Sequence, residues 1–195
     1  ADTFTVTGTM KRDDGYRTIT TVNTADGDDT VTVSLNAAAD GFFALNTESG
    51  SDHVDASSST LGITLFGGLG ADTIKGGSGG DTIFGDQGRI DYLDGSGNVV
   101  TRLGLGLTDR VVLTPAQSVS GEADVPFFQT DGVNRQATLV TTRDAATGSA
   151  DVIDGGDGDN TILGGIAGDS ITTGTGTDLI LGDNGSIQYD AAGVL

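Results

Sequence analysis

Aspartates recur at a fixed distance from glycines in the middle of the chain. Residues 67–84 read GGLGADTIK and then GGSGGDTIF, so that an Asp and an Ile return after nine residues. Glycines adopt the positive φ angles of tight turns and let backbone carbonyls lie close together. Carboxylate and carbonyl oxygens are the ligands that Ca²⁺ prefers, whereas softer metals prefer His or Cys. The spacing therefore indicates turns in which Asp and backbone oxygens hold calcium.

The same unit returns near the C-terminus. GGDGDNTIL, GGIAGDSIT and TGTGTDLIL follow one another over residues 155–181, and a weaker copy, ATGSADVID, precedes them at 146–154. Looser copies lie in the N-terminal third, TADGDDTVT at 24–32 and TESGSDHVD at 47–55. We interpret the longer intervals between these as full coils with longer returns on the far side.

The acidic residues are almost all Asp. The chain has 195 residues, a formal net charge of −19, and 26 Asp against two Glu. Asp is short and suits tight turns, so these carboxylates are expected in turns rather than on a solvated acidic surface. The charge argues against binding nucleic acid or an anionic membrane surface. The absence of Cys excludes disulfides and thiolate sites.

Consecutive copies in nine-residue register resemble the repeat of RTX (repeats-in-toxin) proteins, a calcium-binding β-roll family. The unit is GGxGxDxUx, where U is a large aliphatic residue. Its first six positions form a turn and its last three a short strand whose middle residue enters the core. We therefore expect an all-β fold, a right-handed parallel β-helix or β-roll with stacked calcium turns, interrupted by a small β insert.

The resemblance assigns calcium ligands residue by residue, with about 4–7 Ca²⁺ ions in all. The carboxylate ligands are expected to be Asp29, Asp52, Asp72, Asp81, Asp151, Asp169 and Asp178, with Asn160 as an amide substitute. The carbonyl ligands are expected from Gly68, Gly70, Gly77, Gly79, Gly156, Gly158, Gly165, Gly174 and Gly176. Asp86, Asp157 and Asp183 are either extra ligands or plain surface. The aliphatic positions Ile74, Ile83, Ile162, Ile171 and Ile180 are expected in the core.

Stacking of turns predicts two edges in each block. Turns 24–29, 47–52, 67–72 and 85–90 are expected on one edge and turn 76–81 on the other. In the second block, turns 146–151, 164–169 and 182–187 are expected on one edge, and 155–160 and 173–178 on the other. Two of these turns depart from the unit, because Ile90 and Ile187 stand where the Asp should be.

Five segments follow from this pattern. Irregular β-helix coils are expected at 1–66, the first RTX block at 67–93, a β insert at 94–147, the second block at 148–190, and the start of a second, truncated insert at 191–195. Within the first insert, LDGSGNVV suggests a hairpin turn, RVVLTP and QATLVTT suggest strands, and Phe127 and Phe128 are adjacent. The insert is interpreted as an edge-covering excursion, with a partner-binding face as the alternative.

The leading functional hypothesis is a calcium-binding structural or spacer module of a large secreted or bacterial cell-surface protein. RTX resemblance implies export to a calcium-rich exterior, where the chain would fold on meeting Ca²⁺. The expected partners are calcium ions and neighbouring modules or an extracellular ligand, without nucleic acid or membrane insertion. An adhesive module that binds carbohydrate, a surface or ice is the alternative. A β-helical polysaccharide-active enzyme is remote, because the only His, His53, occupies a variable repeat position; we expect no catalysis.

Overall fold

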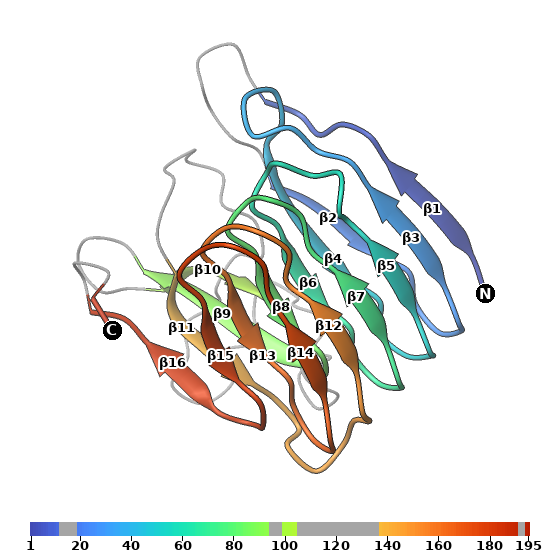
Figure 1. Ribbon diagram of the computed structural model, residues 1–195, viewed down its shortest axis with the longest axis vertical. Coiled ribbons are helices and arrows are strands. Elements are labelled where there is room, and N and C mark those ends of the chain that lie inside the picture. Colours follow the sequence, from blue (N-terminus) through green and yellow to red (C-terminus); the bar gives the residue numbers. More distant parts are fainter. Residues whose placement is uncertain (12–18, 94–98, 105–136, 191–193) are drawn as a thin grey trace, which may run out of the picture.

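The computed structural model describes residues 1–11, 19–93, 99–104, 137–190 and 194–195. Every regular element in these residues is a β-strand, and the strands form three sheets (Figure 1). Two sheets are parallel with six strands each, and the third is antiparallel with four. The predicted all-β fold of stacked parallel coils is confirmed. The described residues contain no helix with the length and hydrophobicity that crossing a membrane requires.

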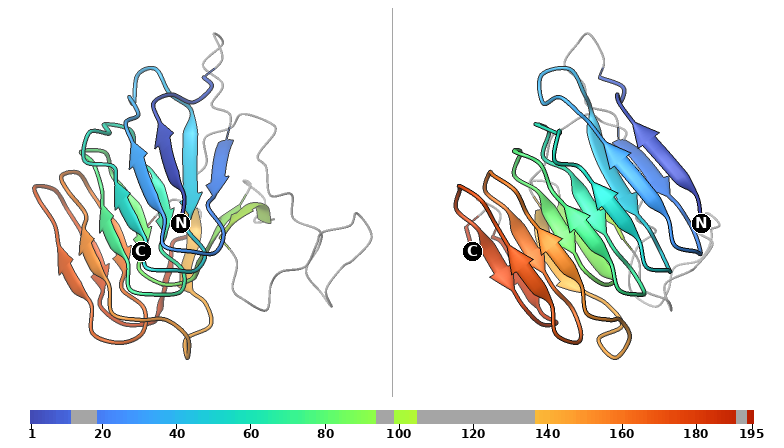
Figure 2. Two further views of the ribbon diagram at one scale, coloured as in Figure 1. Left: turned by 90° about the vertical axis from the view of Figure 1, so that its right-hand side faces the viewer. Right: turned by 45° about the vertical axis from the view of Figure 1, so that its right-hand side comes forward.

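The two parallel sheets take alternate strands from successive coils, so the chain changes sheet at each turn (Figure 2). In spatial order the first sheet contains β1 (Thr3–Val6), β3 (Thr30–Val33), β5 (His53–Asp55), β7 (Thr73–Lys75), β12 (Val152–Asp154) and β14 (Ser170–Thr172). The second contains β15 (Leu179–Leu181), β13 (Thr161–Leu163), β8 (Thr82–Phe84), β6 (Thr64–Phe66), β4 (Phe42–Asn46) and β2 (Ile19–Asn23).

The core lies between these two sheets and is built from the middle residue of each short strand. In the first sheet Val54, Ile74 and Ile153 pair in register, and all three are at most 1% exposed. In the second sheet Ile83 and Ile162 pair in the same way and are fully buried. Burial of each such side chain contributes about 1.5–3 kcal/mol, so the ladder of aliphatic residues fixes the register of the coils.

The last coil differs from this pattern. Ile171 is only partly buried, and Ile180 is 44% exposed although it pairs in register with Ile162. The predicted core position of Ile180 is therefore wrong within the described residues. The reason is geometric, because β14 and β15 are the outermost strands of their sheets and have a described neighbour on one side only.

The two repeat blocks form a single stack. Strand β7 pairs with β12 and β8 pairs with β13, which places the second block directly on the first. The antiparallel sheet lies beside this stack and has the strand order β10 (Val99–Leu103), β9 (Gly88–Leu93), β11 (Ala137–Thr142) and β16 (Ser186–Gln188). The excursion from the stack thus begins with β9, several residues before the predicted start at 94.

The predicted turns 85–90 and 182–187 are too long, because residues 88–90 already belong to β9 and residues 186–187 to β16. Ile90 and Ile187 are buried in a second apolar cluster with Phe66, Phe84 and Leu163, in which Phe66 and Phe84 stack 4.8 Å apart. These two isoleucines replace Asp because they leave the roll and pack against its outer face. Residues 105–136, including RVVLTP and the adjacent Phe127 and Phe128, and the hairpin turn at 94–98 lie outside the described residues.

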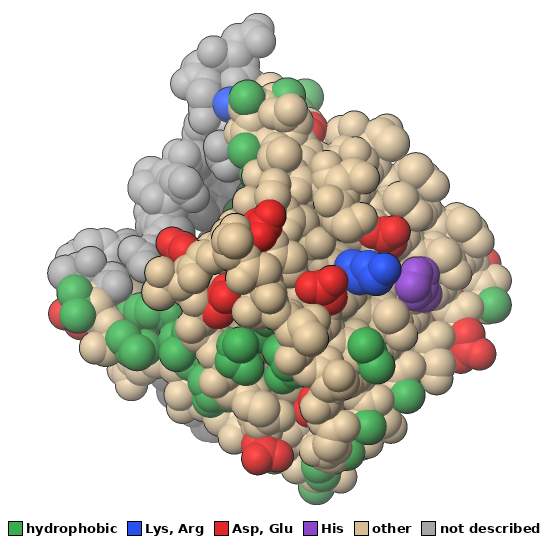
Figure 3. Space-filling view, in the orientation of Figure 1, with side chains coloured by type: hydrophobic (Ala, Val, Ile, Leu, Met, Phe, Trp, Pro, Cys, Tyr) green, Lys and Arg blue, Asp and Glu red, His purple; other side chains and the backbone are tan. Residues whose placement is uncertain are grey.

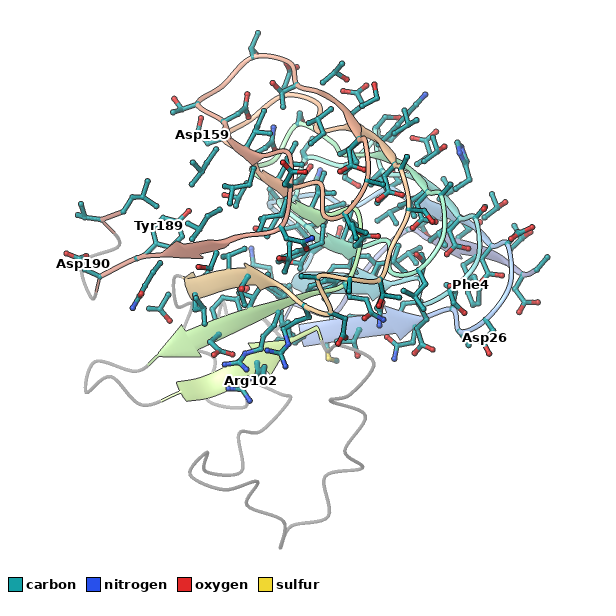
Figure 4. All side chains as sticks on the ribbon, turned by 90° about the horizontal axis from the view of Figure 1, so that it is seen from below. Phe4, Asp26, Arg102, Asp159, Tyr189 and Asp190 are labelled. Carbon is teal, nitrogen blue, oxygen red and sulfur yellow. The ribbon has the colours of Figure 1, made fainter. Side chains whose placement is uncertain are left out.

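A buried ion pair joins neighbouring strands of the antiparallel sheet. Asp91 of β9 accepts hydrogen bonds from Arg89 Nη2 at 2.7 Å and from Arg102 Nε of β10 at 2.7 Å. Burial raises the pKa of Asp91, but the bonds from Arg102 and Arg89 outweigh it and lower this pKa overall. Figure 4 shows Arg102 on the antiparallel sheet, away from the coil turns.

Candidate functional site

Five aspartates form one continuous ladder along an edge of the roll. The backbone N–H of Asp29 donates to Oδ1 of Asp52 at 2.7 Å, and the N–H of Asp52 donates to Oδ1 of Asp72 at 2.8 Å. The N–H of Asp72 then donates to Oδ1 of Asp151 at 2.8 Å, across 79 residues of sequence. The N–H of Asp151 donates to Oδ1 of Asp169 at 2.9 Å. We call these five residues the Asp ladder.

The second carboxylate oxygen of every ladder residue is buried and unsatisfied. Oδ2 of Asp29, Asp52, Asp72, Asp151 and Asp169 finds no hydrogen-bond partner in the part of the chain that the structure describes. Four of these residues are only 1–2% exposed, namely Asp29, Asp52, Asp72 and Asp151. A buried carboxylate oxygen without a hydrogen-bond partner is unfavourable, and a cation bound beside it would remove that cost.

A backbone carbonyl points to the same place as the free oxygen. A β-carbon on Gly67 would lie 2.6 Å from Oδ2 of Asp72 and would overlap the carbonyl oxygen of Gly85. A β-carbon on Gly164 would likewise overlap Oδ2 of Asp169 and the carbonyl oxygen of Gly182. A carboxylate oxygen and a carbonyl oxygen of the next coil therefore converge where only glycine leaves room. Both are acceptors, and this convergence suits a hard cation such as Ca²⁺.

The first two coils vary this arrangement by replacing the leading glycine with threonine. Thr47 Oγ1 donates to the carbonyl oxygen of Gly67 at 2.6 Å, and Thr24 Oγ1 donates to the carbonyl oxygen of Thr47 at 3.2 Å. In these coils a side-chain hydroxyl thus donates to the carbonyl of the next coil, which a leading glycine cannot do. The free oxygens of Asp29 and Asp52 nevertheless remain, which keeps both residues as candidate ligands.

The glycines predicted as carbonyl ligands lie where successive coils touch. Gly70 has a φ of 119°, and its absent side chain faces the carbonyl of Gly50 in the coil above. Gly156 and Gly158 face the carbonyls of Gly77 and Gly79 in the same way. Gly68, Gly165, Gly174 and Gly176 also lie against backbone or carboxylate oxygens of a neighbouring coil. These positions crowd backbone oxygens into the turns, as calcium ligation requires.

The opposite edge carries a different arrangement. Asp81 Oδ1 accepts the N–H of Ile63 at 2.9 Å, and its Oδ2 accepts the N–H of Gly77 at 2.8 Å. The N–H of Asp81 donates to Oδ1 of Asn160, and the N–H of Asn160 donates to Oδ1 of Asp178 at 3.0 Å. Turns 76–81, 155–160 and 173–178 thus share this edge as expected, but Asp81 already uses both oxygens.

Asn160 differs from the expected role of an oxygen ligand. Its Oδ1 is used by the N–H of Asp81, as Oδ1 is used in the Asp ladder. Its Nδ2 stands where the free Oδ2 of an aspartate would be. It donates to Oδ1 of Asp178 at 3.0 Å and to the carbonyl oxygens of Gly158 at 3.1 Å and Gly156 at 3.4 Å. The amide nitrogen therefore takes the carbonyl contacts that a cation would make in this turn.

Burial changes the acidity of the central carboxylates. It raises the pKa of Asp72 to about 8, with the negative charges of Asp151, Asp52 and Asp86 adding to the effect. It raises the pKa of Asp151 to about 7 and the pKa of Asp81 to about 6. The same cause raises the pKa of Asp52 and Asp86. Near neutral pH Asp72 and Asp151 therefore retain much of their protonated form unless a cation replaces the proton.

The remaining uncertain aspartates separate by burial. Asp86 is 2% exposed, whereas Asp183 and Asp157 lie on the surface. Asp157 Oδ1 only joins coils, accepting the N–H and the hydroxyl of Thr175 at 2.8 Å each. Figure 3 shows no cluster of acidic side chains on the outer face of the first sheet, where the visible Asp and Glu side chains lie apart from one another. Figure 4 shows Asp26 and Asp159, which it labels, on well-separated turns.

No three Asp, Glu or His side chains among the described residues converge closely enough to hold a metal by themselves. A site on the Asp ladder therefore depends on backbone carbonyls, with one free carboxylate oxygen contributed by each coil. That division of ligands explains why glycine and aspartate recur together.

The family comparison agrees with this geometry. The family model of the RTX calcium-binding nonapeptide repeat matches four copies, at residues 64–89, 145–169 and 154–186. These segments match RTX calcium-binding nonapeptide repeats, so the chain carries calcium-binding repeats on a parallel β-roll. No curated protein and no solved structure gave a significant match. Asp29 and Asp52 lie outside the matched segments but continue the same ladder.

Proposed function

We propose that this chain is a calcium-dependent structural module of a secreted or cell-surface protein, and that it folds when it meets extracellular Ca²⁺. The observation that carries the proposal is the row of five buried, unsatisfied carboxylate oxygens on one edge. Two carboxylates about 6 Å apart repel by roughly 3 kcal/mol at an effective dielectric constant of about 20. Stacked coils therefore need cations on this edge at alkaline pH.

Calcium supplies stability in proportion to the number of occupied sites. At a free concentration ten times Kd, each site adds roughly 1.4 kcal/mol to the free energy of unfolding. Four gaps along the Asp ladder would together add about 5–6 kcal/mol. This is comparable to the whole net stability of a small domain, so calcium would act as a folding switch.

A catalytic role has no support among the described side chains. His53 is exposed at an outward position of β5. The outward positions paired with it are Thr30 and Thr73, followed by Val152 and Ser170. This row is mixed, and the aligned Thr64, Thr82 and Thr161 of the second sheet are flanked by Ala44 and Leu179, so neither row is a long rank of threonines. We therefore propose a structural, non-catalytic role rather than adhesion or catalysis.

Circular dichroism of the chelator-treated chain at pH 8, titrated with Ca²⁺ and separately with Mg²⁺, tests the proposal. We expect a cooperative gain of β signal with Ca²⁺ near millimolar concentration and little change with Mg²⁺. A chain that is already fully folded in excess chelator at this pH would contradict the folding switch.

A further inference from the structure

The excursion into the antiparallel sheet leaves and rejoins the roll inside a single turn. After β8, the N–H of Gly85 donates to the carbonyl of Leu163 at 2.9 Å, which stacks Gly85 on the next coil. The chain then departs along β9 and returns along β11. It rejoins at Ser149, whose N–H donates to Oδ1 of Asp86 at 3.1 Å across 63 residues.

The two arms of the excursion lie side by side at the point of departure. Gly88 of β9 pairs with Thr142 of β11, and the carbonyl of Gln87 accepts the N–H of Arg143 at 2.8 Å. Residues 86 and 148 are thereby brought together, so the turn can continue as if the excursion were absent.

The sequence on the two sides completes one repeat. Without residues 87–147, the chain reads GDGSADVID from Gly85, which has nine residues with Asp151 sixth and Ile153 eighth. Ile153 is fully buried and pairs with Ile74 and Ile171, the eighth residues of two intact repeats. The exposed Ala146 and Thr147, which the contiguous sequence suggests as the start of this repeat, are displaced by Gly85 and Asp86.

The interrupted turn has the same local geometry as the intact ones. A β-carbon on Gly85 would overlap Oδ2 of Asp151 and the carbonyl oxygen of Gly164. This repeats the relation of Gly67 to Asp72 and of Gly164 to Asp169, although Gly85 and Asp151 belong to opposite sides of the excursion. Asp151 is 1% exposed and its Oδ2 is unsatisfied within the described residues. A buried, unpartnered oxygen is therefore aimed at the junction itself.

Asp86 joins three segments at this junction. Its Oδ1 accepts the N–H of Ser149, its Oδ2 accepts the N–H of Ile166 at 2.6 Å, and the residue is 2% exposed. Both oxygens are used, so Asp86 positions the two halves of the turn rather than offering a free oxygen. Its charge also lies near the carboxylates of Asp151 and Asp169.

We propose that Oδ2 of Asp151 and the carbonyl of Gly164 converge beside Gly85 in a composite calcium site, and that Asp86 positions the two halves of this site by joining Gly85 to Ser149. The proposal rests on the proposed function and adds a specific role to it. Calcium at this junction fixes both ends of the 87–147 excursion to the roll. Calcium then controls how the roll-proximal ends of β9 and β11 are held to the stack, besides the stability of the stack itself.

The full-length chain with three substitutions tests this site. Gly85→Ala places a methyl group among the converging oxygens, Asp151→Asn removes the free oxygen, and Thr147→Ala is the matched control for a contiguous repeat. The first measurement is the number of Ca²⁺ ions bound per chain, by calorimetric titration of chelator-treated protein. The second is hydrogen exchange of the peptide 143–152 with and without Ca²⁺.

We expect Gly85→Ala and Asp151→Asn each to lose one ion per chain and the calcium-dependent protection of residues 143–152. Thr147→Ala should match the wild type in both measurements. If wild type binds calcium but Gly85→Ala keeps the same ion count and protection, the composite site is overturned while the proposed function stands. An equal loss in Thr147→Ala also overturns it. A wild-type chain that takes up no calcium overturns both.

Discussion

At the scale of single residues, one atom separates a cation site from a closed turn. In the Asp ladder the second oxygen of each side chain is buried and free. At the equivalent position Asn160 has a nitrogen that donates to the carbonyls of Gly156 and Gly158. An amide satisfies the carbonyls in one case, and a cation would satisfy them in the other. Exchange of Asp and Asn should therefore move calcium sites without changing the fold.

Asn160→Asp should create a calcium site on the opposite edge. The substitution replaces a donor with a buried acceptor, so the metal-free protein should lose on the order of 1–3 kcal/mol. The calcium-loaded protein should gain one bound ion. Calorimetric titration and thermal unfolding with and without Ca²⁺ measure both effects. Asn23→Asp, at an exposed position in β2, serves as the control and should change neither value. An unchanged ion count in Asn160→Asp would refute the hypothesis that the amide of Asn160 takes the place of a cation.

Asp72→Asn should have the reverse effect. The amide can donate to the carbonyl that now faces Oδ2, while its Oδ1 still accepts the N–H of Asp52. We expect one ion fewer per chain and a higher unfolding temperature in chelator at pH 8, because a buried carboxylate is removed. Ca²⁺ at ten times Kd should stabilise the variant by about 1.4 kcal/mol less than it stabilises wild type. A lower unfolding temperature in both conditions would argue against a calcium site at Asp72.

At the scale of the turns, glycine serves close approach as well as backbone freedom. Gly70 has a φ of 119° and faces the carbonyl of Gly50, so both requirements meet at one residue. Gly168 belongs to the same kind of repeat, but its absent side chain faces open space. The repeats thus contain glycines that the stack requires and glycines that it tolerates.

Gly70→Ala and Gly168→Ala form a matched pair. The first should destabilise the calcium-loaded protein by about 2 kcal/mol or more, because the strained φ and the coil contact both oppose a β-carbon. The second should stay within about 0.5 kcal/mol of wild type. Urea unfolding in saturating Ca²⁺ measures the two differences. Similar losses in both variants would mean that coil contact does not select glycine at Gly70.

The repeat spacing predicted most of the strands and turns of the roll, but it did not predict that one repeat is interrupted by the excursion. The nine-residue period placed the strands around Ile74, Ile83 and Ile162 and grouped their turns, because periodic burial determines both. It could not show that Gly85 and Asp151 share a turn, since ATGSADVID imitates an uninterrupted repeat. The signal was present in the paired segments GDQG and GDNG, each followed by Ile in place of Asp. Only the folded geometry shows that Gly85, and not the contiguous Ala146, takes the first position of the repeat that contains Asp151.

At the scale of the whole molecule, the buried carboxylates couple folding to pH. Their pKa values in the folded state are raised above the ordinary value of 3.8, to about 8 for Asp72, 7 for Asp151 and 6 for Asp81. In metal-free protein the folded state therefore holds protons that the unfolded state has already released. The stability linked to these groups is fully present below about pH 4 and is lost as pH rises to about 8.

Metal-free protein should accordingly be more stable at pH 5 than at pH 8.5. Because Ca²⁺ competes with these protons, its apparent affinity should increase over the same range. Thermal unfolding in chelator across this range, together with calcium titration at each pH, measures the two opposite trends. The triple variant Asp72→Asn, Asp81→Asn, Asp151→Asn is the control and should flatten both. A metal-free protein whose stability increases with pH would contradict the assignment.

The joining of the two repeat blocks also sets an order of events during folding. Most neighbouring coils contact each other across 18–23 residues of sequence, but β7 and β8 meet the second block across 79. Loop-closure entropy makes that one contact costlier by roughly 1.3 kcal/mol than an 18-residue closure. The coils up to β8 can form through local contacts, and so can those of the second block, whereas docking of one block on the other must wait for a longer search. The roll should then form in two kinetic phases, with the slower one ending at the junction of Gly85 and Asp151.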